Sequence, residues 1–162
     1  MNGKFTHYLI TRYNIRLDQW EKDVRGQSTL GDPWMQHRFE LFSRYCFPSV
    51  VAQTTRDFSW LIYLESTTSP FHVQQIRNLT LDYPFIQIRL VEGYFGCLRD
   101  IDAALIKSDA SFVITSRLDN DDAIDMGYIR TVQDYFVPED KTLINMLNGC
   151  GYMPHRRVAM RL

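Results

Sequence analysis

Cysteine is scarce in this sequence, and long apolar runs are absent. The chain of 162 residues has three cysteines, far apart and without a Cys-x-x-Cys pair, so no disulfide framework is predicted. No apolar run approaches the ~20 residues of a membrane span, and the N-terminus lacks the apolar core of a signal peptide. We therefore expect a protein of a reducing compartment, the cytoplasm, without a transmembrane segment.

An excess of charge of either sign is lacking as well. The formal net charge is −1, so bulk electrostatics does not favour a nucleic-acid partner. The four histidines have no ligand spacing with one another or with the cysteines, which argues against zinc. Walker and Rossmann glycine loops and a Gly-x-Ser-x-Gly elbow are missing, and Gly93 and Gly96 are typical of a plain loop.

What the sequence does have is a regular alternation of strand and helix patterns. Strands are predicted at 8–11, 58–64, 85–91, 112–115 and 143–147, and helices after Asp32-Pro33, after Ser69-Pro70, and over 97–108 and 124–136. This alternation predicts one α/β domain over residues 1–162, built on a mostly parallel sheet with flanking helices. Residues 16 to 32 are expected to form an irregular loop anchored by Trp20.

Details of the helices can be predicted too. Asp32 is expected to cap its helix, with Pro33 at the first helical position, and Pro48 is expected to restart the chain. Arg38 is most simply a solvated side chain. In the helix predicted over 97–108, the residues expected to face the core are Leu98, Ile101, Leu105 and Ile106.

Three carboxylates, Asp119, Asp121 and Asp122, follow the apolar run 112–114, which reads as a strand buried on both faces. In an extended segment, Asp119 and Asp121 point the same way and can approach one divalent cation together. Hard oxygen ligands of this kind suit Mg²⁺, Mn²⁺ or Ca²⁺, and Mg²⁺ completes its shell with water and substrate phosphates. The alternative is a helix that starts near Ala123 and is capped by Asp121 or Asp122. Both roles can coexist.

The polar residues that follow the predicted strands should meet at one edge of the sheet. Ligands of open α/β sheets bind beyond the carboxyl ends of the strands. Thr11 and Arg12 follow the first strand, Glu65 follows the second, and the aspartates follow the fourth. We therefore expect these side chains to line one rim.

The order of these motifs resembles a known enzyme family. Pro48–Thr54 followed by a strand is similar to a signature of family 2 glycosyltransferases, and Gly93–Asp122 is similar to their next signature, which ends in Leu118–Asp122. More narrowly, His7–Asn14 and Thr115–Ile124 resemble the putative rhamnosyltransferases, a bacterial group with the GT-A fold. The resemblance covers nearly the whole chain.

That resemblance implies transfer of a sugar, rhamnose being one candidate, from a nucleotide-sugar donor such as dTDP-rhamnose to a saccharide or lipid-linked acceptor. It implies a divalent metal, Mn²⁺ or Mg²⁺, held by Asp119 and Asp121. The residues it places at the donor are Thr11, Arg12, Glu65, Arg99, Asp119 and Asn120. For such an acceptor, a peripheral position at the inner membrane is the alternative to a free cytoplasmic one.

The chain departs from the family pattern in two places. Glu65 stands where related enzymes usually carry Asp, and the chain stops at Leu162, before the acceptor half and the catalytic base that such domains usually include. No general base can be assigned. We therefore expect an incomplete domain in which the apolar residues of 143–147 lack a partner, and a non-catalytic remnant that binds a nucleotide-sugar is the alternative function.

Overall fold

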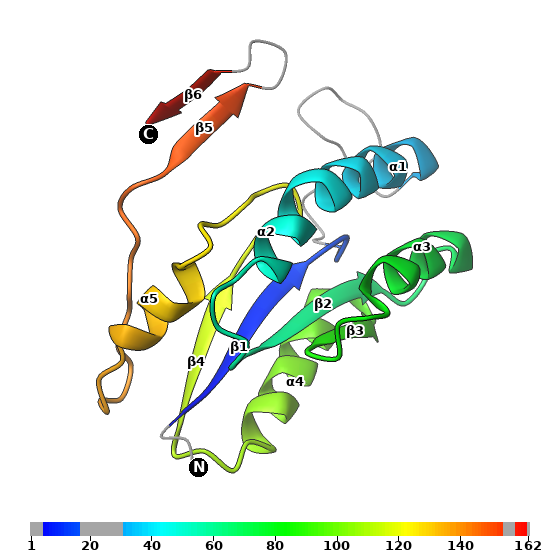
Figure 1. Ribbon diagram of the computed structural model, residues 1–162. Coiled ribbons are helices and arrows are strands. Elements are labelled where there is room, and N and C mark those ends of the chain that lie inside the picture. Colours follow the sequence, from blue (N-terminus) through cyan, green and yellow to red (C-terminus); the bar gives the residue numbers. More distant parts are fainter. Residues whose placement is uncertain (1–4, 17–30, 154–157, 162) are drawn as a thin grey trace.

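A four-stranded parallel sheet forms the centre of the protein, as the sequence predicts (Figure 1). The computed structural model describes residues 5–16, 31–153 and 158–161. The strands lie in the order β3-β2-β1-β4. Their bounds are β1 Phe5–Arg12, β2 Ser59–Glu65, β3 Ile86–Val91 and β4 Phe112–Arg117.

The position of a strand in the sheet decides how far it is buried. β2 lies inside the sheet, and Trp60 to Glu65 are all buried. β3 lies at one edge and is half exposed, as predicted. β4 lies at the other edge, so 112–114 are only partly buried, and the prediction of a strand buried on both faces is wrong.

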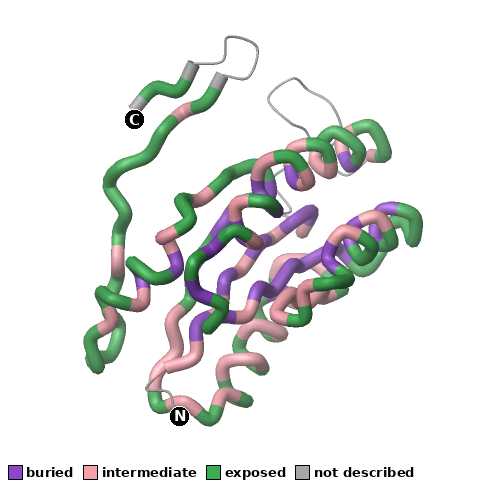
Figure 2. Tube along the Cα trace, viewed as in Figure 1, coloured by how far each residue is buried: buried purple, intermediate pink, exposed green. Residues whose placement is uncertain are grey.

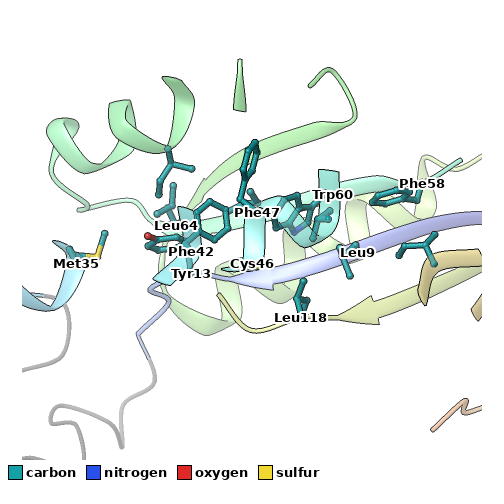
Figure 3. Close-up of a cluster of buried hydrophobic side chains, with 14 residues drawn as sticks. Leu9, Tyr13, Met35, Phe42, Cys46, Phe47, Phe58, Trp60, Leu64 and Leu118 are labelled. Atoms are coloured by element: carbon teal, nitrogen blue, oxygen red, sulfur yellow. The ribbon is translucent and has the colours of Figure 1, made fainter. Parts of the chain in front are cut away.

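One face of the sheet is covered by several helices (Figure 1). A continuous helical run connects β1 to β2, and α3 and α5 pack on the same face. The run comprises α1 Asp32–Leu41, the π-helical turn η1 Phe42–Cys46 and α2 Phe47–Val51, and the other two are α3 Pro70–Thr80 and α5 Tyr128–Asp134. Leu9 and Trp60 of the sheet pack with Phe42 and Phe47 at the centre of the larger core (Figure 3).

The opposite face is covered by α4, Gly93–Ile106. Cys97 and Ile101 pack there against Leu61 and Tyr63 of β2. This helix begins four residues earlier than predicted, so Gly93 and Gly96 lie in its first turn and not in a loop. Gly93 has φ +62°, a value that favours glycine, and this conformation lets the chain turn directly from β3 into the helix.

Three further predictions about the helices are wrong. Leu98 and Ile106 are exposed, by 39% and 84%, because α4 packs through the stripe that contains Cys97 and Ile101. Gly31 is the N-cap of α1, and Asp32 lies in the first turn. The helix also does not restart at Pro48 but runs on through η1, where the Phe47 N–H donates to the Phe42 carbonyl, five residues back.

The last part of the chain differs from the predicted fifth strand. Residues 143–147 form no strand, and Leu143 and Leu147 are 90% and 81% exposed. The strands that follow are β5 Cys150–Met153 and β6 Val158–Arg161, which pair antiparallel in a separate two-stranded sheet. This pair lies apart from the main sheet, and the chain leading to it is largely exposed (Figures 1 and 2). The apolar residues of 143–147 are thus largely uncovered, as expected.

The predicted anchor Trp20, with most of the 16–32 loop, lies outside the described residues. Within the described ranges, no helix is both long and apolar enough to cross a membrane. Cys46 and Cys97 are buried free thiols, and Cys150 is an exposed one.

Candidate donor-binding site

The order in which strands are added to the sheet changes direction between β1 and β4, although the two strands are parallel. From β1 the chain moves outward to β2 and β3 through helices on one face, and it then returns through α4 on the other face to place β4 beside β1. In an open α/β sheet, such a reversal leaves a crevice at the carboxyl ends of the two strands, where ligands bind. Arg12 ends β1 at this point, and Asp119–Asp122 follow β4.

The segment Asp119–Asp122 forms a tight turn, here called the aspartate turn. The Asp122 N–H donates to the Asp119 carbonyl at 3.2 Å, with Asn120 and Asp121 between them. The segment is therefore not extended, and the predicted alternation of side chains does not apply. Nor do these aspartates cap a helix near Ala123, because α5 begins at Tyr128 with Gly127 as its N-cap.

Two arginines pair with carboxylates of the turn. Arg117 pairs with Asp119 at 3.0 Å, and Arg38 of α1 pairs with Asp121. Arg38 also donates to the side-chain oxygen of Asn120 at 3.2 Å. The sequence interpretation of Arg38 as a solvated side chain is therefore wrong.

Asn120 attaches the turn to the end of β1. Its side chain is buried, with 4% of the residue exposed, and its Nδ2 donates to the Tyr13 carbonyl at 2.7 Å. A side chain that follows β4 thus bonds the backbone that follows β1. This bond fixes the position of the turn relative to the end of β1, and the predicted contact of Asn120 with a donor stays a prediction.

The backbone after the turn is held by α2 and the residues that follow it. The buried Gln53 donates to the Asp125 carbonyl at 2.6 Å and accepts from the Ile129 N–H at 2.9 Å. The Ser49 hydroxyl accepts from the Ile124 N–H at 3.2 Å. Pro48–Thr54, one of the segments on which the family resemblance rests, therefore positions the chain between the aspartate turn and α5.

The electrostatics of the turn favours a cation. Burial, then the charges of Asp121 and Asp119, raises the pKa of the Asp122 carboxyl above its usual value. Burial and the same three carboxylates raise the pKa of the neighbouring Cys46 thiol, which donates to the Asp119 carbonyl at 3.6 Å. Negative charge is therefore in local excess despite the two arginines.

The donor set of the turn fits a hard divalent cation. No group of three or more His, Cys, Asp or Glu side chains suited to a metal ion occurs within the described ranges. Asp119 and Asp121 keep 49% and 38% of their side-chain surface exposed and offer only hard oxygen. Mg²⁺ in proteins commonly takes one or two carboxylates and fills its shell from water and phosphate, so the type of ligand that the turn offers is one that Mg²⁺ accepts.

Glu65 lies in a different environment at the carboxyl end of β2. Its carboxylate accepts the Gly93 N–H at 3.1 Å and the Arg16 N–H at 3.4 Å, and only 5% of the residue is exposed. Its own N–H donates to Asn14 Oδ1 at 3.1 Å, and Asn14 Nδ2 donates to the Thr68 hydroxyl at 2.9 Å. The carboxylate thus joins the start of α4 to the loop after β1.

A small pocket of about 170 Å³ opens beside Glu65. Pockets for whole drug-sized ligands are commonly about 300–1,000 Å³, so this one has room for only a part of such a ligand. Its walls are Asn14, Arg16, Asp32, Met35, Glu65, Thr67, Thr68, Ser69 and His72. His72 contacts Asp32 at 3.1 Å and so joins α3 to α1 across the pocket, a pairing that sequence spacing did not indicate.

The three remaining predicted residues, Thr11, Arg12 and Arg99, lie in different surroundings. Thr11 is fully buried, and its hydroxyl accepts from Trp60 Nε1 at 2.9 Å, so its side chain belongs to the core. Arg12 lies over the Tyr94 ring at 5.5 Å, near the start of α4. Arg99 is exposed and lies well inside α4, because this helix begins at Gly93 and not at Cys97 as predicted.

A larger groove, of about 730 Å³, runs along the free edge of β4. It is bounded by β4, α5 and the segment 136–146. None of the predicted donor or metal residues lines it. The groove beside the sheet is therefore separate from the predicted residues at the carboxyl ends of the strands.

Comparison with known proteins identifies the family. A family model described as putative rhamnosyl transferase matches residues 7–144. No curated protein matches the chain. The matched span includes most of the main sheet, the aspartate turn, Gln53 and Glu65. The chain therefore belongs to the putative rhamnosyl transferase family, a family of glycosyltransferases.

Proposed function

We propose that this protein binds a nucleotide-sugar, with dTDP-rhamnose as the first candidate, and transfers its sugar to a saccharide or lipid-linked acceptor. One observation carries the proposal. Two exposed carboxylates, Asp119 and Asp121, lie on a fixed turn at the reversal point of the sheet, and within the described ranges only arginine side chains are seen to pair with them.

The pocket beside Glu65 is proposed to hold the base or ribose of the donor. The Glu65 carboxylate already accepts two backbone N–H groups. A carboxylate has about four acceptor sites, so a ribose hydroxyl or base N–H can still be accommodated. The Glu65 side chain, which stands in place of the usual Asp, accepts the Gly93 N–H and forms one wall of this pocket.

Asp119 and Asp121 are proposed to hold Mn²⁺ or Mg²⁺ against the donor diphosphate. A bound divalent ion would neutralise the charge that develops on the leaving diphosphate. Arg12 ends β1 at the same rim and is proposed to face the diphosphate as well, since guanidinium groups bind phosphate oxygens well. The Thr11 side chain, held in the core, is left out of this assignment.

Direct titration tests the donor site. Isothermal calorimetry should show Mn²⁺ and a nucleoside diphosphate binding more tightly together than apart, with the same coupling measured from either side. The Asp121→Asn variant should lose most of this coupling. Glu65→Gln should weaken binding of the nucleotide without abolishing the coupling to Mn²⁺. Equal binding by all three proteins would contradict the assigned roles.

Turnover separates transfer from binding. The full chain is incubated with dTDP-rhamnose and Mn²⁺, with and without candidate saccharide acceptors, and release of the nucleoside diphosphate is followed. Turnover lost in Asp121→Asn supports a transferase. Binding without turnover for every donor would instead favour the alternative function, a protein that binds the nucleotide-sugar and does not transfer it.

A further inference from the structure

Arg38 is the side chain that most directly occupies the acidic side of the candidate site. It comes from α1, far from the aspartate turn in sequence, and it contacts both the Asp121 carboxylate and the Asn120 amide oxygen. Its side chain is 27% exposed, and that of Asp121 is 38% exposed. The Arg38–Asp121 pair is therefore accessible to water and ions and lies outside the hydrophobic core.

The position of the guanidinium is set by its own helix. It lies over the Trp34 ring at 5.1 Å, four residues earlier on α1. A divalent ion bound to Asp121 would meet this positive charge at close range. The two cations would repel each other, and their attraction to one carboxylate cannot be fully satisfied at the same time.

We propose that Arg38 is the internal counter-cation of the aspartate turn and gives up Asp121 when a divalent cation binds. Arg38 thereby sets how tightly the site holds metal, and it keeps the turn neutralised when no metal is bound. This inference rests on the proposed function, because it concerns loading of the same site.

Release of Arg38 from Asp121 is coupled to donor binding, because the freed guanidinium can bind the donor's phosphates. A freed guanidinium on this rim can donate to phosphate oxygens, which are better partners than water. A nucleoside diphosphate would thus offset the loss of the Asp121 pair. Metal loading without nucleotide should therefore show the effect of Arg38 most strongly.

The test is a titration of Mn²⁺ alone into the wild type and the Arg38→Met variant, followed by calorimetry and by the free Mn²⁺ signal in electron paramagnetic resonance. Methionine keeps an unbranched stem against Trp34 and removes the charge. A partly exposed ion pair contributes up to about 1 kcal/mol, so we expect Mn²⁺ to bind more tightly to Arg38→Met, by up to about fivefold.

Three companion variants make the result specific. Arg38→Lys retains a charge and should bind Mn²⁺ within about twofold of the wild type, by the same energy scale. Arg44→Met, which removes an equal charge from η1 at a side chain that lies over the Tyr45 ring, should bind like the wild type. In an Asp121→Asn background, Arg38→Met should give no gain, because a double-mutant cycle isolates the pair.

The outcomes separate this inference from the proposed function. Unchanged or weaker Mn²⁺ binding by Arg38→Met, in a protein whose circular dichroism matches the wild type, overturns the counter-cation role and leaves Arg38 as a support of the turn. An equal gain in Arg44→Met overturns it too. If the wild type binds Mn²⁺ neither alone nor with a nucleoside diphosphate, the metal site itself is wrong and the inference falls with it.

Discussion

The two acidic regions at the carboxyl ends of the strands are neutralised in opposite ways. Glu65 is 5% exposed and accepts backbone N–H groups from Gly93 and Arg16. Asp119 and Asp121 are 49% and 38% exposed, and the charges that pair with them are on arginine side chains.

This difference separates a region whose shape is set by folding from one that can exchange its partners. Backbone N–H groups at the start of a helix cannot withdraw without unfolding that turn. An arginine side chain can rotate away at the cost of a pair that is usually weak at the surface. In the proposed function, the Glu65 pocket would recognise a rigid group and the aspartate turn would take up a mobile cation.

The largest expected effect is on the free energy of unfolding. It tests whether the backbone that follows the aspartate turn is held as firmly as the surroundings of Glu65. Gln53→Leu removes three hydrogen bonds of a buried amide, to Ser49, Asp125 and Ile129, and leaves the fully buried Ile129 N–H without its partner. Such orphaned groups cost about 1–3 kcal/mol each, so urea unfolding should show a loss of about 3 kcal/mol.

The exposed Gln36 on α1 provides the matched control. Gln36→Leu should change the free energy of unfolding by less than about 0.5 kcal/mol, as surface substitutions usually do. A similar small change for Gln53→Leu would mean that the chain after the turn is not held by α2.

Acid should weaken the side of the sheet that carries the aspartate turn. His7 of β1 contacts the Ser116 hydroxyl of β4 at 2.9 Å, and Gln133 lies 3.4 Å from its other ring nitrogen. Burial lowers the pKa of His7 from 6.5 to about 4, against a smaller opposing effect of Asp57. As the pH falls, His7 is therefore protonated in the unfolded chain before it is protonated in the folded protein.

The sign of the pH dependence follows from that order. The contribution of His7 to stability is complete above pH 6.5 and decreases as the pH falls toward about 4. At about pH 5 the expected loss is about 2 kcal/mol relative to pH 7. Urea unfolding at both pH values checks this, and His7→Gln should remove most of the difference. An unchanged pH dependence in that variant would show that other groups are responsible.

A smaller effect is expected at Glu65. Glu65→Gln retains one acceptor oxygen for the Gly93 N–H and loses the charge that strengthens this bond. The expected loss is about 1 kcal/mol, because bonds to charged groups exceed neutral ones by about that amount. Amide hydrogen exchange should report the loss at the start of α4. Faster exchange throughout the sheet, with none specific to α4, would contradict the local role.

The smallest effect on stability is expected at Asp121. Asp121→Asn loses the Arg38 pair and also relieves repulsion with Asp122, so the free energy of unfolding should stay within about 0.5 kcal/mol of the wild type. The pKa of Asp122 should move down toward its usual value, which carbon-detected NMR titration can follow. An unmoved pKa would mean that the Asp122 carboxyl responds to burial alone.

The main sheet could be predicted because strands and helices carry local patterns. The apolar runs around Trp60 and Val113 and the helical period after Pro70 each indicate an element within a few residues. The strand-end rule correctly placed Glu65 and the aspartates near one rim. The rule does not say which of two adjacent residues at a strand end faces outward. It therefore predicts both Thr11 and Arg12 as site residues, although Thr11 is buried and only Arg12 is partly exposed.

The partners of the candidate site could not be predicted in the same way. Arg38 meets Asp121 across 83 positions of sequence, and Gln53 meets Ile129 across 76. Contacts at such separations leave no periodic trace in the sequence, so the residue patterns that predict helices and strands cannot reveal them. The predicted strand at 143–147 failed for a related reason: an apolar run becomes a strand only where an edge pairs with it, and β4 does not.

The π-helical turn η1 contains one residue more than a regular α-helical turn, and this residue sets how α1 is rotated about its axis relative to α2. One extra residue within a helix rotates everything beyond it by about 100° relative to an unbroken α-helix. Deleting one residue between Phe42 and Cys46 would let the run close as a regular α-helix. With the Phe47 side held in the core, α1 would then turn about its axis, and Arg38 would be carried away from Asp121. The register of one turn thus decides which face of α1 meets the acidic site.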